Sequence, residues 1–167
     1  MSAPGPVVEA SARRRRLVIA LAVAAIIIAI DQVTKTLAVD HLSSGPVHVI
    51  GPLSLELAFN SGVAFSLGTG DTLPIILVAI GLIVVVFWFL RGAPSNTIAS
   101  GLGLVLGGAI GNLADRLFRG RHGAVVDFIH VGFWPTFNVA DTSIVCGCVV
   151  LVIGLARSEF SHPGASR

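Results

Sequence analysis

The stretch LVIALAVAAIIIAIDQVTKTLAV, residues 17–39, decides what kind of protein this is. It is long enough to cross about 30 Å of hydrocarbon, which takes roughly 20 mostly apolar residues. Three more stretches of similar character lie at 72–90, 97–117 and 137–156. Because 54% of all residues are hydrophobic and 12% are charged, the chain is too apolar for a soluble domain. We predict a mainly α integral membrane protein whose one domain, 17–157, has four transmembrane helices.

Basic residues before the first span predict the orientation. Arg13–Arg16 precede it directly, and such a run next to the first helix favours the cytoplasmic side. A cleavable signal peptide fits poorly, because the apolar run continues past Asp31 and Lys35 without a small-residue cleavage site. With four spans, both termini are expected in the cytoplasm. Residues 1–16 are expected to form a disordered basic tail, and 158–167 a second tail.

The connections after the first and third spans then lie on the outer side. In the first, leucines alternate with other residues from 53 to 60, which is a strand pattern, and Gly51-Pro52 predicts a turn from a short strand at 47–50. We therefore expect a small β-sheet segment over 45–68 at the outer membrane interface. The second connection, 118–136, is expected to be a loop, although its arginines count against an outer location.

Acidic residues near the outer ends of the spans indicate a polar site, because a carboxylate at membrane depth needs a partner, water or a function. Asp31 has Lys35 one helical turn later, which predicts an ion pair. Asn112, Asp115 and Arg116 share one helix face, and the Asp115–Arg116 pair could link helices by charge-assisted hydrogen bonds. These patterns predict a structural role.

Asp127 and Asp141 differ, because neither has a basic residue at helical spacing. Two carboxyl groups that share one proton can act together: one serves as general base on a water and the other protonates the reacting carbonyl. Paired acids in membranes also relay protons or cations. The pair alone therefore leaves two classes open, an aspartic peptidase and a small proton-coupled transporter.

No metal, cofactor or nucleic-acid site is indicated by the sequence. His41, His48 and His130 lack the spacing of metal ligands with each other or with cysteine. Cys146 and Cys148 lie inside the last span, where thiols usually pack as small apolar groups. A Gly-rich phosphate loop, a Ser–Lys dyad and an HExxH motif are all missing from the sequence.

Small residues repeat every four positions along the third span, at Ala99, Gly103, Gly107 and Gly111. Such a stripe lets a neighbouring helix approach closely. We interpret it as packing within the four-helix bundle and expect a monomer.

Five motifs occur in order along the chain: DQVTK at 31–35, FNSGVAFS at 59–66, GNLADR at 111–116, VVDF at 125–128 and FNVAD at 137–141. In this order across four spans they resemble the lipoprotein signal peptidase family, also called signal peptidase II. The resemblance implies an aspartyl peptidase of the bacterial plasma membrane with its active site at the outer face. Its substrates would be prolipoproteins, cut just before a cysteine that carries a diacylglyceryl group, and membrane lipids would surround it.

The resemblance also implies residue roles. The catalytic pair would be Asp127 and Asp141. The substrate site would be lined by Asn60, Gly62, Asn112, Arg116 and Asn138. The supporting residues would be Asp31, Lys35 and Asp115.

The segment FNSGVAF between the outer strands and the second span has a physical explanation on this reading. Asn60 would offer amide hydrogen bonds to an extended substrate backbone without transferring protons, and Gly62 permits close approach or a positive φ. Phe59 and Phe65 would lie against lipid or helix. One departure from the family is the longer connection LFRGRHGA, 117–124, which we expect to be a solvated outer loop.

Overall fold

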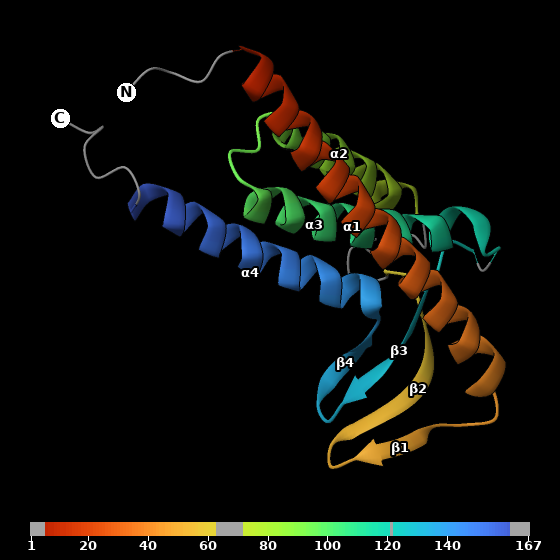
Figure 1. Ribbon diagram of the computed structural model, residues 1–167. Helices are drawn as coiled ribbons and strands as arrows, with labels where there is room; N and C mark the ends of the chain where they lie inside the picture. Colours follow the sequence, from red (N-terminus) through yellow and green to blue (C-terminus); the bar gives the residue numbers. More distant parts are fainter. Residues whose placement is uncertain (1–5, 63–71, 121, 161–167) are drawn as a thin grey trace.

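The computed structural model describes residues 6–62, 72–120 and 122–160 (Figure 1). Four helices form a bundle, and each is long and apolar enough to cross a membrane. They are α1 (Pro6–His41), α2 (Leu73–Leu90), α3 (Asn96–Phe118) and α4 (Val139–Phe160). The four-span prediction is therefore confirmed.

The first helix begins earlier than expected. It starts at Pro6, so the prediction of a disordered tail is wrong for residues 6–16, while 1–5 lie outside the described residues. Proline suits a first helical position, and the Ala, Glu and Arg residues that follow are good helix formers that continue into the span. Arg16 also donates a hydrogen bond to the Ala93 carbonyl oxygen, 2.9 Å away, which ties α1 to the loop between α2 and α3. At the other end, α4 continues to Phe160, so the expected second tail begins later than residue 158.

Helix α3 forms the centre of the bundle because its glycines allow two neighbours to approach. A Cβ on Gly103 would lie 2.6 Å from the Ala20 carbonyl oxygen of α1, and Gly107 contacts the same helix. Gly101 and Gly108 leave equally little space toward α4. The small-residue stripe therefore packs within the molecule, as predicted.

An antiparallel sheet of four strands lies at one end of the bundle (Figure 1). Its strands, in spatial order, are β1 (Val47–Ile50), β2 (Leu53–Asn60), β3 (Val125–Val131) and β4 (Trp134–Phe137). The strands predicted at 47–50 and 53–60 are confirmed.

The expected loop over 118–136 instead contains β3 and most of β4. The sequence VVDFIHV is rich in β-branched residues and lies between glycines with positive φ, Gly123 (77°) and Gly132 (56°), which favours a strand. Strand β3 pairs with β2 from Leu53 opposite Val131 to Asn60 opposite Val125, with a shift of register between Leu55 and Ala58. The sheet packs on the bundle through Phe128, which joins Ala38 and Leu42 in a small apolar core.

Candidate active site

Asp127 and Asp141 meet where the sheet joins the helices. Asp127 lies on β3, and Asp141 lies in the first turn of α4, which follows β4 directly. Asn138 stands between them: its side-chain amide donates to the Asp127 carboxylate at 2.7 Å, and its backbone N–H donates to the Asp141 carboxylate at 3.2 Å. Asn138 therefore donates a hydrogen bond to each of the two carboxylates.

The local reason for the Asp141 position is helix capping. The Asn138 side-chain oxygen accepts from the Asp141 backbone N–H at 2.9 Å, while Asp141 accepts in return from the Asn138 backbone N–H. This reciprocal pair is a capping box, with Asp141 at the third helical position. Asn112 of α3 also donates to Asp141 at 2.8 Å. Two hydrogen-bond donors thus fix one carboxylate at the start of α4.

Asp127 is 2% exposed, and its burial raises its pKa from the ordinary value to about 6. Its hydrogen bond with the Asn60 side chain lowers this pKa, the nearby charge of Asp141 raises it, and the hydrogen bond from Asn138 lowers it. Asn60 is on β2 beside β3, and its own side-chain oxygen accepts from the Gly62 backbone N–H at 2.9 Å. Asn60 is therefore oriented by its own turn and contacts the acid.

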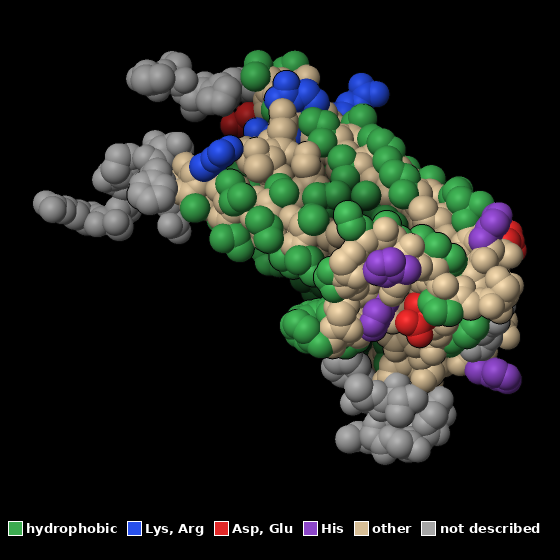
Figure 2. All heavy atoms as spheres, turned by 90° about the horizontal axis from the view of Figure 1, so that it is seen from below, with side chains coloured by type: hydrophobic (Ala, Val, Ile, Leu, Met, Phe, Trp, Pro, Cys, Tyr) green, Lys and Arg blue, Asp and Glu red, His purple; other side chains and the backbone are tan. Residues whose placement is uncertain are grey.

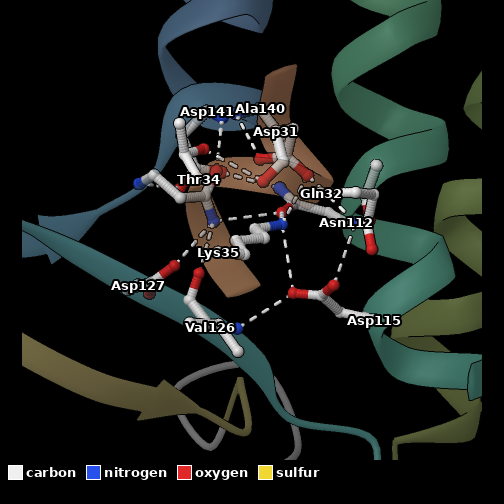
Figure 3. A network of polar contacts seen from close by, with 12 residues as sticks. Asp31, Gln32, Thr34, Lys35, Asn112, Asp115, Val126, Asp127, Ala140 and Asp141 are labelled. Atoms are coloured by element: carbon white, nitrogen blue, oxygen red, sulfur yellow. Dashed lines mark hydrogen bonds and ion pairs between the residues drawn. The ribbon is translucent and has the colours of Figure 1, made fainter. Parts of the chain in front are cut away.

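A fully buried lysine lies beside the two acids and is linked to them through other polar side chains. The Lys35 ammonium lies 2.8 Å from the Asp31 carboxylate and 3.1 Å from that of Asp115, and it donates to the Asn112 side-chain oxygen at 2.9 Å (Figure 3). The predicted Asp31–Lys35 ion pair is confirmed. Because Asn112 also donates to Asp141, one side chain links the lysine to the pair of acids.

The two carboxylates that Lys35 holds each bind a backbone N–H just before one member of the pair. Asp31 accepts from Ala140, the residue before Asp141, and Asp115 accepts from Val126, the residue before Asp127, each at 3.0 Å (Figure 3). Residues from α1 and α3 therefore set the positions of β3 and of the start of α4.

The prediction that Asp115 and Arg116 link helices holds for Asp115, which binds Lys35 and Gln32 of α1, whereas the Arg116 hydrogen bond to the Asn112 carbonyl oxygen stays within α3. Asp115 pairs with Lys35 and with Arg119, whose Nε lies 2.7 Å from its carboxylate. Neighbouring helix residues point in different directions, whereas a spacing of four brings Arg119 over Asp115. The Arg116 guanidinium instead donates to the Asn112 carbonyl oxygen and lies where Asp141 and Asp127 act on it electrostatically. Its Nε is buried without a hydrogen-bond partner among the described residues.

Arg119 and Gln32 are polar residues of this region that sequence reasoning missed. Arg119 was expected in a solvated loop, but it follows the last turn of α3 and binds the Gln32 side chain and the Thr36 hydroxyl of α1, each at 3.2 Å. Gln32 in turn donates to Asp115 at 3.0 Å. The i,i+4 spacing from Asp115 was the signal that could have identified Arg119.

Gly62 has a φ of 70°, as the sequence suggested, and a Cβ there would overlap the Ile75 side chain of α2. Phe59 is 42% exposed at the end of β2. The expectation for Phe65 falls outside the described residues. Among the residues that the structure describes, no cluster of His, Cys, Asp or Glu has the arrangement of a metal site.

The comparisons with known proteins agree on one family. Residues 23–157 match the model of the family described as signal peptidase (SPase) II. A lipoprotein signal peptidase of Mycobacterium avium is 51% identical over 144 residues, covering 83% of this chain and 79% of that protein. Lipoprotein signal peptidases of Mycolicibacterium smegmatis and Mycobacterium tuberculosis are 46% and 49% identical, covering 99% and 87% of this chain and 73% and 74% of their own lengths.

Two solved structures, both described as a bacterial membrane enzyme studied by the in meso method, share the fold. Each gives a TM-score of 0.72. One, at 1.9 Å resolution, is 26% identical and covers 81% of this chain and 91% of its own length. The other, at 2.3 Å, is 24% identical and covers 89% and 93%.

Proposed function

This chain belongs to the signal peptidase II family, and on that premise we propose that Asp127 and Asp141 are its catalytic pair. As a member of the family it is an aspartic-type membrane peptidase that removes signal peptides from prolipoproteins. The observation that carries the assignment is the Asn138 bridge, which holds both carboxyl groups at one junction of sheet and helix.

The two carboxyl groups differ in their surroundings, which assigns them different roles. Burial makes Asp127 the acid that holds a proton at mildly acidic pH, since its pKa is about 6. Asp141 accepts two hydrogen bonds at a helix N-terminus, an environment suited to a carboxylate. Asp141 accepts a proton from water as the water oxygen attacks the scissile carbonyl carbon, and Asp127 gives its proton to the carbonyl oxygen. The carbon–nitrogen bond then breaks as Asp141 gives the proton it accepted to the leaving amine, and Asp127 takes back a proton from one hydroxyl of the tetrahedral intermediate as the carboxylic acid product forms.

Two polar side chains beside the pair are assigned to substrate binding. Arg116 has a buried Nε that lacks a partner among the described residues, and a buried donor of this kind gains from a substrate carbonyl. Asn60 orients Asp127 and lies at the end of β2, where an extended peptide could pair. Gly62, Asn112 and Asn138 complete the proposed binding residues, and Asp31, Lys35 and Asp115 support them.

The location of the site suits an amphipathic substrate. The acids lie where the apolar helices end and the sheet begins, so a signal helix could remain in the bilayer while the peptide bond reaches the interface (Figure 1). We propose that the bond lies just before a diacylglyceryl-modified cysteine. We also propose a plasma-membrane location with both termini cytoplasmic, a monomeric state and contacts with surrounding lipids. The comparisons lend no support to the transporter alternative.

The test is cleavage of a diacylglyceryl-modified prolipoprotein by the purified chain in detergent. Asp127→Asn and Asp141→Asn should each lower kcat by about 10⁴-fold, and the double variant should be no worse, because residues that act as a unit are not additive. Asp40→Asn, near the outer end of α1, is the control and should retain activity. Retained cleavage in either single variant, with native helix content, would remove that residue from the pair.

A further inference from the structure

Two adjoining cavities lie between the start of α1 and the end of α2. This is the end of the bundle opposite the sheet (Figure 1). The first, about 400 Å³, lies between the start of α1 and the loop after α2, and the second, about 260 Å³, lies beside it. Arg13 and Arg91 line both cavities. The two spaces therefore border the same two guanidinium groups, and we call them together the arginine region.

The charge of this region is strongly positive. Arg16 adds a third guanidinium to the first cavity, and Arg14 adds one to the second. Glu9 is the acidic residue in the linings of these two cavities, and it forms no ion pair with an arginine within the described part of the chain. The Arg16 Nε is also buried without a hydrogen-bond partner among the described residues. The guanidinium groups thus outnumber the carboxylate and keep unused donors.

The second cavity also has apolar walls. Leu17 of α1 and Phe87 of α2 line it, and they are 37% and 40% exposed on helices long enough to span a membrane. Leu90 closes it on the bundle side. The arginine region therefore continues directly into the apolar surface that faces hydrocarbon.

We propose that this region binds the headgroup of an anionic phospholipid. Guanidinium groups bind phosphate oxygens with paired hydrogen bonds, and basic pockets between membrane helices recognise anionic headgroups. The headgroup phosphate lies between Arg13 and Arg91, and the adjoining acyl chain lies along Leu17 and Phe87. The apolar wall distinguishes a lipid from free phosphate, which would gain nothing from it.

The experiment uses the full chain purified in a zwitterionic detergent. Phosphatidylglycerol is titrated against it, with phosphatidylcholine and inorganic phosphate as parallel arms, and binding is followed by native mass spectrometry and by the thermal unfolding midpoint. We expect phosphatidylglycerol to bind and raise the midpoint, and the other two to leave both readouts unchanged.

The variants test the arginines that line the cavities. Arg13→Gln and Arg91→Gln should each weaken phosphatidylglycerol binding by about fivefold, and together by roughly 25-fold. Arg15→Gln is the matched control: it lies in the same arginine run, lines neither cavity, and hydrogen-bonds the Asn96 side chain. It should retain wild-type binding. If the double variant loses its helix content, the binding measured for the two single variants decides the test.

Three results would overturn the proposal. Equal binding of phosphatidylcholine would show that the headgroup charge is irrelevant. An equal effect of inorganic phosphate would show that the apolar wall is irrelevant. An Arg15→Gln loss as large as that of Arg13→Gln would mean that surface charge alone, rather than this pair of cavities, attracts the lipid.

Discussion

Asp127 shows how opposing local effects determine the behaviour of one acid. Burial alone favours the neutral form, whereas hydrogen bonds from Asn60 and Asn138 favour the ionised form. Burial prevails, and the pKa lies near 6, which leaves the acid able both to keep and to release a proton near neutral pH. Asn60 therefore contributes to the protonation of the acid, in addition to the binding role proposed for it.

The proposed chemistry predicts a bell-shaped pH profile, in which the alkaline limb reports loss of the proton from the coupled pair. Because the hydrogen bond from Asn60 lowers the pKa of Asp127, Asn60→Ala should raise that pKa. The alkaline limb of kcat/KM should then move to higher pH. Loss of one or two hydrogen bonds to the substrate should also reduce kcat/KM by about ten- to two-hundredfold.

The measurement is cleavage of a lipidated peptide across pH for wild type and for Asn60→Ala. Ser54→Ala, on the same strand but away from the acid, is the control and should keep the wild-type limb. An alkaline limb that stays in place or moves to lower pH in Asn60→Ala would contradict a role for Asn60 in the protonation of Asp127.

At the scale of elements, the ionic cluster around Lys35 joins four parts of the chain. Lys35 and Asp31 belong to α1, and Asp115 belongs to α3. Asp115 accepts from a backbone N–H of β3, and Asp31 accepts from a backbone N–H of α4. Burying charges is costly, and the cost is offset only when each charge is paired and hydrogen-bonded. The cluster meets that condition, so its value lies in specifying how the elements meet.

Lys35→Met should therefore be severe, because it leaves Asp31 and Asp115 buried without the ammonium between them. Removal of one partner from a buried ion pair costs about 3–5 kcal/mol. Arg119→Gln should cost only about 1 kcal/mol, because the Arg119 side chain is 20% exposed and glutamine can still donate a hydrogen bond. Unfolding of both variants in mixed detergent measures the difference. Equal losses would mean that Lys35 has no special place in the cluster.

Helix contacts give a second prediction at this scale. Gly103→Ala should destabilise the bundle by about 1–3 kcal/mol, because the new methyl group would meet the backbone of α1. Gly81→Ala is the matched control on α2, where a Cβ meets nothing within 4 Å. In a helix interior, that change should be neutral or stabilising by up to about 1 kcal/mol. Thermal unfolding in one detergent compares the two, and a neutral Gly103→Ala would disprove close packing of α1 and α3.

At the scale of the whole molecule, exposed arginines and exposed histidines lie in different parts of the surface. In the view onto the sheet end, the visible Lys and Arg side chains lie at the far edge of the molecule, whereas histidines lie on the face turned to the viewer (Figure 2). The arginines near the first span favour a cytoplasmic location of their end. On this hypothesis the sheet and the acids would lie on the outer side.

Cysteine labelling tests this orientation in cells. Single cysteines at Ser43 and Gly120, in a background with Cys146 and Cys148 replaced by serine, should react with a membrane-impermeant maleimide added outside. Cysteines at Pro94 and Ser158 should react only after the membrane is opened, because α2 and α3 place Pro94 at the arginine end. Labelling of Ser43 and Pro94 from the same side would contradict the four-span topology.

The sequence alone determined the features that rest on local periodicity and composition. Long apolar runs are costly to expose to water, which predicted four spans. Alternation predicted the strand at 53–60, and the Gly51-Pro52 turn signal predicted the strand at 47–50 before it. The i,i+4 spacing of Asp31 and Lys35 predicted their ion pair. The catalytic role of Asp127 and Asp141, which lack basic partners at helical spacing, stays a prediction.

Tertiary structure decided which distant groups meet. The spacing of four makes Arg119 a local partner of Asp115, but only the packing of α3 on α1 brought Lys35 to the same carboxylate. The strand at 125–131 forms because β2 offers it a partner along its length, and short apolar segments do not reveal such pairing by themselves. Asp127 and Asp141 are joined through Asn138 because the pairing of β3 with β4 brings Asp127 beside the start of α4. A buried polar group binds whichever partner the packing brings to it, whereas sequence spacing predicts only partners one or two helical turns away.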